Sequence, residues 1–366
     1  MRNSRVPPTI SDVARRAGVS IATVSRVLNH NSPVAQTTSE RVLAAIQELG
    51  FVPRAAARGL ASHRTHTLGL VLPEIGREFF LPLLRGIEAE ARATGYDLLI
   101  ETTRTPDTAR RSLGGLGEHN TDGLIIFTDS VEDAELSRLF KTGLPMVLLH
   151  QTPPKGTDIP VITIENKSGA QRIVDHLIEV HHCKRIAFLR GPAGNEDSEW
   201  RERGYCQALK NHGLAFDPML VASGGYDPAE AQQAVEQWLM DGLEVEAIFT
   251  GDDDAATGVL DALQRAGKRV PQDLAVVGFD DVSVSRYLNP PLTTVRSPIE
   301  QVGRESVRQL VKAIQSEATD AVTLLPTELI IRGSCGCPWS PRSALSAEAA
   351  HPSGDGLLEL PGLTRS

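Results

Sequence analysis

A short segment near the start of the chain carries residue types that can read the edges of DNA bases. Ser20 is expected to cap a helix over residues 21–28, in which Ala22 and Arg26 lie four positions apart and so share one face. An arginine can donate two hydrogen bonds to guanine, and the apolar side chains of Ile21 and Ala22 can contact a thymine methyl group. The pattern therefore predicts base reading by Ile21, Ala22 and Arg26.

Short polar side chains surround these three residues. They are Ser20, Thr23, Ser25 and Asn29. Groups of this kind suit DNA phosphates, which position a protein on the duplex without reading its sequence. The alternative is a plain three-helix bundle whose arginines only face solvent, and the helical pattern by itself leaves this alternative open.

Two further helices are predicted around the base-reading helix. One covers residues 10–17, with Thr9 as its cap and Gly18 as its end, and the other begins at the capping-box pair Thr37 and Glu40 and ends at Gly50. The third helix is expected to bury Val42, Leu43, Ile46 and Leu49. Helix, glycine turn, helix and supporting helix predict a helix-turn-helix, whose second helix enters the major groove.

Residues 54–62 form a second basic segment with the composition of a short helix. Gly59 costs about 1 kcal/mol relative to alanine, and so short a helix is expected to form only against a partner. Leu60 has no evident core to enter, which suits a wedge that opens a base step in the minor groove. The alternative is that Leu60 packs on the neighbouring domain.

A second group of residues with binding chemistry follows apolar runs later in the chain. Arg201, Tyr226 and Asp280–Asp281 each lie after or beside such a run, and Phe79 and Phe80 follow the first one. A bidentate arginine, carboxylates that accept paired hydroxyls and aromatic faces suit a sugar. Each residue alone could equally be a salt bridge, a helix cap or a core aromatic.

The sequence offers no motif for catalysis or for a bound metal. Cys335 and Cys337 are expected to be incidental, and His63 and His66 lie in a linker without a third ligand. The acidic run Asp252–Asp254 is expected to open a helix, where carboxylates are favoured. We therefore expect no catalytic residue, no metal and no cofactor.

The elements that must position the second group begin at Thr67, where apolar strands alternate with amphipathic helices. The expected strands are residues 68–72, 96–100, 123–127, 146–149, 185–189, 247–250, 274–277 and 326–331. This alternation predicts two doubly wound parallel-sheet lobes, with a ligand bound at the carboxyl ends of the strands, in the cleft between the lobes. Gly114, Gly115 and Gly117 predict a short or distorted helix in the first lobe.

Charge is distributed unevenly over the 366 residues, whose formal net charge is −9. Residues 1–62 contain eight arginines, no lysine and three acidic residues, which gives +5 and leaves −14 for the remainder. A basic unit joined to an acidic one is therefore compatible with a nucleic-acid partner. Four cysteines exclude a disulfide scaffold, and the absence of a long apolar run or a signal-like start predicts a cytoplasmic protein without a membrane partner.

The N-terminal motifs resemble the headpiece and hinge helix of the lactose-repressor (LacI/GalR) family of transcription regulators. The resemblance lies in Thr9–Ala14, Ala17–Ser20, Thr23–Asn29 and Ala57–Leu60. It implies a homodimer on a near-palindromic DNA operator, with hinge residues Arg58 and Leu60 at the DNA. Arg54 departs from the family, which usually has asparagine after the proline.

Residues 67–333 are similar to the effector domain of the same family, which resembles periplasmic sugar-binding proteins. The resemblance implies effector contacts by Pro73, Glu74, Phe79, Phe80, His150, Arg201, Tyr226, Asp252 and Asp280. Asp252 stands where many members have asparagine, and His150 where many have aspartate. These two departures are expected to decide which ligand binds, because a carboxylate only accepts hydrogen bonds whereas an imidazole donates or accepts them.

The expected domains are therefore a helix-turn-helix headpiece, a hinge, a two-lobed effector-binding and dimerisation domain and a disordered tail. Their boundaries are 1–52, 53–66, 67–333 and 334–366, with the first lobe at about 67–165 and 296–323 and the second at about 166–295 and 324–333. The predicted protein is a DNA-binding transcriptional repressor controlled by a sugar. The alternatives are a purine corepressor, a solute-binding protein with a helical leader, and a sugar-acting enzyme that uses Asp280 and Asp252.

Overall fold

The computed structural model describes residues 8–29, 34–51, 64–103, 113 and 115–339 of the chain. The chain divides into two compact units, one of Met1–Thr163 with Ile299–Thr323 and one of Ile164–Pro298 with Leu324–Ser366. The predicted hinge helix with Arg58 and Leu60 lies outside the described residues, as do His63 and the side chain of Asn29. Within the described part of the chain, no helix has the length and apolar character needed to cross a bilayer.

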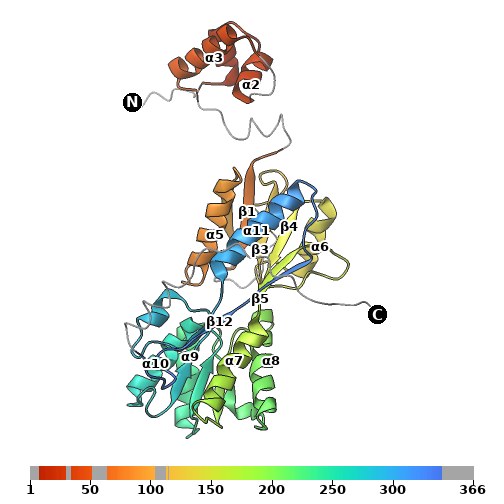
Figure 1. Ribbon diagram of the computed structural model, residues 1–366. Helices are drawn as coiled ribbons and strands as arrows, with labels where there is room; N and C mark the ends of the chain where they lie inside the picture. The colour runs from red at the N-terminus through yellow and green to blue at the C-terminus, as the bar shows by residue number, and fades with distance from the viewer. Residues whose placement is uncertain (1–7, 30–33, 52–63, 104–112, 114, 340–366) are drawn as a thin grey trace. The chain divides into compact units, whose positions relative to one another are not determined.

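The N-terminal headpiece contains the three predicted helices (Figure 1). They are α1 (Ile10–Ala17), α2 (Ile21–Asn29) and α3 (Gln36–Leu49). Thr9 and Asp12 form a capping box at the start of α1, and Gly18 (φ 64°) and Gly50 (φ 61°) end α1 and α3 in the left-handed conformation. Val13, Val24 and Val42, one from each helix, are fully buried and form the centre of the headpiece core.

Two predictions for α3 are wrong. The helix begins one residue before Thr37, Ala35 is its N-cap, and no side chain caps it. Leu43, which was expected in the core, is 55% exposed, because Val42 and Ala45 already fill the face that α3 turns towards α1.

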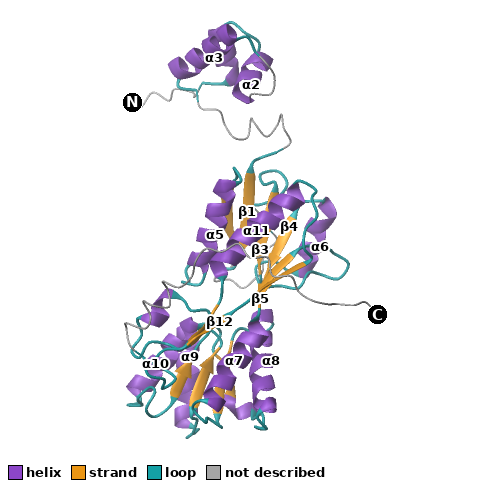
Figure 2. Ribbon diagram, in the orientation of Figure 1, coloured by secondary structure: helices purple, strands orange, loops and turns teal. Residues whose placement is uncertain are grey.

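The rest of the first unit is a six-stranded sheet with three helices (Figure 2). The strands, in sheet order, are β11 (Val322–Leu325), β5 (Val161–Ile164), β4 (Met146–Leu149), β3 (Gly123–Phe127), β1 (Thr67–Leu72) and β2 (Asp97–Thr102). The helices are α5 (Phe80–Ala93), α6 (Asp133–Thr142) and α11 (Ile299–Ile314). The strands from β5 to β2 pair in parallel, as the alternation predicts. Residues 115–120 form turns, and the remainder of the glycine-rich segment around them lies outside the described residues.

The second unit is built around a four-stranded parallel sheet. Its strands, in sheet order, are β7 (Val221–Ser223), β6 (Ile186–Arg190), β8 (Ala247–Thr250) and β9 (Ala275–Val277). Its helices are α7 (Asn166–Glu179), α8 (Glu196–Asn211), α9 (Pro228–Met240) and α10 (Asp253–Arg265), with short 3-10 turns at Pro218–Leu220 and Ser283–Arg286. Ala187 and Ile248 pack towards α9 and α10, whereas Phe188 and Phe249 stack on the other face near Tyr205 of α8, because successive strand residues point to opposite faces.

The C-terminal segment of the second unit differs from its prediction. The expected strand 326–331 is β12 (Glu328–Ile330), which pairs antiparallel with β10 (Thr294–Arg296) in a separate two-stranded sheet. Nor does a disordered tail begin at residue 334, because Ser334 and Cys335 are buried. The Ser334 hydroxyl donates to the Val276 carbonyl at 2.6 Å, which attaches this segment to β9. All four cysteines of the chain are free.

Asp253 attaches α10 to the segment that leads into β10. It lies in the first turn of α10, as the sequence predicts for the acidic run, but it is completely buried. Its carboxylate accepts hydrogen bonds from the Ser285 hydroxyl (2.5 Å), the Thr294 hydroxyl (2.6 Å) and the Val282 N–H (3.1 Å). Burial raises the pKa of Asp253 above its ordinary value, although the two hydroxyls oppose that shift.

Replacing Asp253 with alanine should destabilise the second unit. Asp253→Ala leaves three donors without their acceptor, so we expect the free energy of unfolding to fall by about 2 to 5 kcal/mol. Asp261→Ala is the matched control, because Asp261 lies on the same helix and its side chain is 44% exposed beside Arg265. Urea unfolding followed by tryptophan fluorescence measures both variants, and equal small losses would contradict the structural role of Asp253.

Candidate functional site

The exposed face of α2 carries the three residues predicted to read bases. Ile21 is 50% exposed, and Ala22 and Arg26 are exposed on the same helix. Val24 and Val27 hold this face outward, because both are buried against α1 and α3. A large apolar side chain and an arginine on the solvent side of a helix in this position suit base edges in a major groove.

The first turn of α2 presents two hydroxyl groups at the amino end of the helix. The Ser20 hydroxyl accepts a hydrogen bond from the Thr23 N–H at 3.1 Å and lies 2.9 Å from the Thr23 hydroxyl. Ser20 is exposed, whereas Thr23 and Ser25 are half-buried. Because the amino end of a helix favours anions, this turn is suited to a DNA phosphate. Arg16 of α1 forms an ion pair with Glu48 of α3 at 2.6 Å, which joins these two helices within the headpiece.

A second group of polar side chains lies at the carboxyl ends of the strands of the second unit, and Arg201 is its centre. Arg201, in α8, is 2% exposed. Its Nε donates to Asn166 Oδ1 at 2.8 Å, its Nη1 donates to the Gly251 carbonyl at 2.5 Å, and its Nη2 donates to Asp280 Oδ1 at 3.0 Å. The Phe279 ring lies beneath the guanidinium, with its centroid 3.8 Å from Cζ. One arginine therefore joins the residues that follow β5, β8 and β9.

Asp280 is held in an uncommon backbone conformation opposite this arginine. Its φ is 102°, a region in which residues other than glycine are strained. The Ser297 hydroxyl donates to Asp280 Oδ1 at 2.9 Å, and Arg201 binds both carboxylate oxygens. Burial alone would lower the pKa of Arg201, but the facing Asp280 carboxylate raises it, so the buried guanidinium stays charged. Such strain is maintained where a site requires a fixed carboxylate.

Tyr226 covers the loops that follow β6 and β8. A side-chain carbon added at Gly191 would overlap the Tyr226 ring, and one added at Gly251 would lie 3.0 Å from it. The ring therefore fits here because both residues are glycines. The Arg201 guanidinium lies 5.6 Å from the Tyr226 centroid. Burial raises the pKa of Tyr226, which keeps its hydroxyl neutral, and that hydroxyl lies 3.5 Å from Asn195 Oδ1.

Asp252 caps a helix beside this group. It is the N-cap of α10 and accepts a hydrogen bond from the Ala255 N–H at 2.8 Å, as predicted for an acidic helix start. It is 8% exposed and lies directly after Gly251, whose carbonyl binds Arg201. Asp252 therefore lies at the carboxyl end of β8, beside the group around Arg201.

The first unit has an aromatic group at the carboxyl ends of its own strands. Phe79, Phe80, Phe127 and His150 lie with neighbouring ring centroids 5.2 to 6.4 Å apart. Phe80 and His150 are buried, at 4% and 1% exposed, whereas Phe79 is half-buried. Phe79 therefore offers the aromatic surface of this group. In the preceding loop, Pro73 and Glu74 are half-buried, and Glu74 pairs with Arg77 at 2.7 Å.

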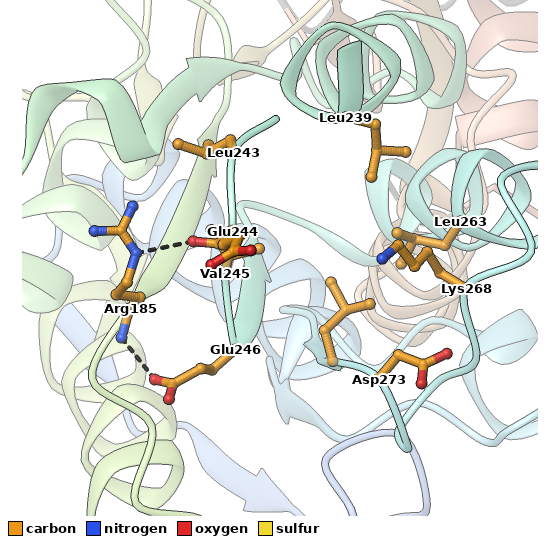
Figure 3. A pocket seen from close by; sticks show the side chains of 10 residues that line it. Arg185, Leu239, Leu243, Glu244, Val245, Glu246, Leu263, Lys268 and Asp273 are labelled. Atoms are coloured by element: carbon orange, nitrogen blue, oxygen red, sulfur yellow. Dashed lines mark hydrogen bonds between the residues drawn. The ribbon is translucent and has the colours of Figure 1, made fainter. Parts of the chain in front are cut away.

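The pocket shown in Figure 3 lies at the other ends of the strands of the second unit. Arg185, Glu246 and Leu274 line this hollow of about 390 Å³, and each directly precedes a strand. The Arg185 side chain donates to the Glu244 carbonyl at 2.8 Å, and its backbone N–H donates to Glu246 at 2.9 Å. Ligands of open parallel sheets bind at the carboxyl ends, so this hollow is not the candidate ligand site.

Sequence reasoning missed several members of the group around Arg201. They are Asn166, Asp197, Asn195, Phe279 and Ser297. Asn166 is the first residue of α7 and Asn195 is the N-cap of α8, and a search for polar residues at helix starts could have found both. Phe279 and Ser297 carry no such signal, because an apolar residue in Gly-Phe-Asp-Asp and a serine before proline are common in folded chains.

Comparisons with known proteins cover both parts of the chain. Residues 9–54 match bacterial regulatory proteins of the lacI family, and residues 174–335 match a periplasmic binding protein-like domain. The chain is 35% identical to the ribose operon repressor of Halalkalibacterium halodurans, over 88% of this chain and 96% of that protein. A solved complex of the transcriptional regulator CelR with cellobiose has a TM-score of 0.68 and 32% identity over 89% of this chain and 99% of its own. The lac repressor dimer bound to operator and the anti-inducer ONPF has a TM-score of 0.79 and 28% identity over 90% and 99%.

Removing the arginine at the centre of the second group should destabilise the second unit. Arg201→Met leaves the Asp280 carboxylate buried without its cation, so the free energy of unfolding should fall by about 3 to 5 kcal/mol. Arg203→Met is the control, because Arg203 lies on the same helix in an exposed pair with Glu199 and should matter far less. Urea unfolding measures both, and an Arg201→Met variant as stable as the control would refute the central place given to this pair.

Proposed function

Because this chain belongs to the lacI family of bacterial regulatory proteins, we propose that it is a DNA-binding transcriptional repressor whose affinity for its operator is controlled by a sugar. The exposed row of Ile21, Ala22 and Arg26 on α2 carries the DNA-binding part of the proposal. The group around Arg201 supports the ligand-binding part. As a regulator, the protein is proposed to bind its ligand without chemical turnover and to act in the cytoplasm.

The charge distribution agrees with binding through the headpiece. Residues 1–62 carry a formal charge of +5 and the remainder −14, so attraction to phosphates is confined to the N-terminal segment. We propose a homodimer on a near-palindromic operator, in which the two headpieces occupy equivalent half-sites. The operator-bound lac repressor dimer supports this assembly. The proposed minor-groove contacts, Arg58 and Leu60, lie in the segment outside the described residues.

The effector is proposed to be a sugar because of the polar group at the carboxyl ends of the second sheet. Asp280 and Asp252 accept hydrogen bonds, Arg201 donates them, and the neutral Tyr226 hydroxyl can do either. Paired sugar hydroxyls require this mixture of donors and acceptors. The names of the relatives point the same way, since one is a ribose operon repressor and another was solved with cellobiose.

We propose Phe79 as an aromatic ligand contact at the carboxyl ends of the strands of the first unit, with Pro73 and Glu74 in the loop before it. Phe80 and His150 support Phe79 from below, because both rings are buried within the same aromatic group. His150 and Asp252 remain the residues proposed to set ligand identity, since they differ from the residues that many family members have at these positions.

Changing Arg26 should reduce the discrimination between operator and other DNA. With a site selected from random duplexes, Arg26→Ala should weaken specific binding by about 5- to 150-fold, because a bidentate contact to guanine is worth about 1 to 3 kcal/mol. Binding to unrelated DNA should weaken far less at the same salt concentration, through the loss of one positive charge alone. Fluorescence anisotropy on both duplexes measures the ratio.

Arg41→Ala is the matched control for that experiment, because Arg41 is an exposed arginine of α3 and its loss changes the charge equally. It should lower specific and non-specific affinity to a similar degree. If Arg26→Ala kept the wild-type ratio of specific to non-specific affinity, the assignment of Arg26 to base reading would be wrong.

Changing Tyr226 should weaken the ligand that the full-length protein binds. Thermal-shift screening against sugars, sugar phosphates and purines identifies that ligand, because a ligand bound only by the folded state raises the melting temperature. Tyr226→Ala should then lower the affinity at least about tenfold, as titration calorimetry measures, since about 1.4 kcal/mol of contact is lost. Tyr287→Ala, which removes a tyrosine that is 79% exposed in the same unit, should leave the affinity unchanged.

The outcome of the screen separates the two parts of the proposal. A melting shift with a purine and with no sugar would overturn the sugar assignment and leave DNA binding intact. Equal sugar affinity in the Tyr226→Ala and Tyr287→Ala variants would show that the group around Arg201 is not the ligand site.

A further inference from the structure

Four metal-binding side chains meet in the second unit, away from the strand ends that form the candidate ligand site. His176 lies in the last turn of α7, His181 lies just after that helix, and Cys335 and Cys337 follow β12. Their ligand atoms all lie within 4.8 Å of one another. The two segments are more than 150 residues apart in sequence, so only the fold brings them together.

The separations among three of these atoms are those of ligands around one ion, and Cys335 Sγ lies within 4.8 Å of each of them. The Nε2 atoms of His176 and His181 lie 3.3 Å apart, and Cys337 Sγ lies 3.6 Å from the first and 3.4 Å from the second. Tetrahedral zinc, with Zn–N of about 2.0 to 2.1 Å and Zn–S of about 2.3 Å, requires N···N of about 3.3 Å and N···S of about 3.6 Å. Two imidazoles and two thiolates are a ligand set that favours zinc.

The backbone between the two cysteines is shaped for this approach. Gly336 has φ 102°, which glycine adopts at little cost, and a side-chain carbon at this position would lie 3.4 Å from the His181 ring. The Gly336 N–H donates to the Gly333 carbonyl at 3.1 Å, which closes the turn. The turn therefore directs Cys335 and Cys337 towards the same pair of imidazoles.

A neighbouring hydroxyl is placed to partner one of the sulfur ligands. The Thr293 hydroxyl donates to Cys335 Sγ at 3.1 Å, as a partner of a thiolate ligand would. Thr293 is itself fixed, because its oxygen accepts the Arg332 N–H at 2.8 Å. The contact therefore orients Cys335 Sγ within the cluster.

We propose that His176, His181, Cys335 and Cys337 bind one Zn²⁺ ion in a closed tetrahedral site. Four protein ligands leave no position for substrate water, so the site is structural. It fastens the segment after β12 to the end of α7, within the second unit. The expectation that the two cysteines are incidental is replaced by this proposal.

Metal analysis of the untagged full-length protein tests the site directly. Zinc measured by plasma mass spectrometry should reach one ion per chain after zinc loading and dialysis. Cobalt added to the apoprotein should give the visible absorption bands of tetrahedral Co²⁺ and a sulfur-to-cobalt charge-transfer band, and zinc should abolish both. Zinc should also raise the melting temperature of the apoprotein.

Variants show which residues hold the ion. Cys337→Ser and His181→Gln should each lose the bound zinc and the zinc-dependent rise in melting temperature. In both variants the sulfur-to-cobalt charge-transfer band should weaken or disappear. Cys206→Ser and His182→Asn are the controls: Cys206 is half-buried in α8, and His182 is exposed at φ 57°, which asparagine tolerates. Both controls should bind zinc as the wild type does. Circular dichroism checks that each variant is folded.

Two results would overturn the proposal. One is wild-type protein that holds well under one zinc per chain after loading and gives no tetrahedral cobalt spectrum. The other is a folded Cys337→Ser or His181→Gln variant that keeps wild-type zinc content and the same zinc-dependent melting shift.

Discussion

The buried ion pair between Arg201 and Asp280 is the interaction on which the second unit depends. A guanidinium with 2% exposure is stable only if its donors are satisfied, and here they bind Asn166, Gly251 and Asp280. These acceptors lie in the segments that follow β5, β8 and β9, so satisfying one side chain fixes three segments of the chain. The strained φ of Asp280 follows from the same requirement, because the carboxylate must face the arginine. The loops that a ligand would contact are therefore fixed before the ligand arrives.

Other buried polar contacts fasten the remaining segments of that unit. Asp253 joins α10 to the segment before β10, and Ser334 joins the segment after β12 to β9. Each of these contacts connects residues that are far apart in sequence and leaves few buried donors without acceptors. The headpiece is organised differently, since its small core of valines and alanines leaves Ile21, Ala22 and Arg26 of α2 exposed. One part of the chain is thus built to present a surface, and the other to hold polar groups in place.

Sequence reasoning placed the apolar elements well and the polar connections poorly. Strands β3, β4 and β8 have the predicted bounds, because each is a short apolar run between polar or glycine residues. Helices α7 and α8 have polar first turns, so apolar periodicity does not mark where they begin. The exposure of Leu43 and the pairing of β12 with β10 depend on tertiary packing, which a local pattern does not contain. For the same reason Arg201 and Asp280 could be named as candidates, whereas Asn166 could not be placed beside Arg201. The sequence likewise could not place His176 and His181 beside Cys337.

Ligand binding and DNA binding are proposed to be coupled in one regulator, and such coupling must be reciprocal. Operator affinity is measured by anisotropy with and without saturating ligand, and ligand affinity is measured by calorimetry with and without saturating operator. Linkage requires the two affinities to change by the same factor, and we expect a factor of at least about fivefold. A ligand that binds the full-length protein and leaves operator affinity unchanged would contradict the claim.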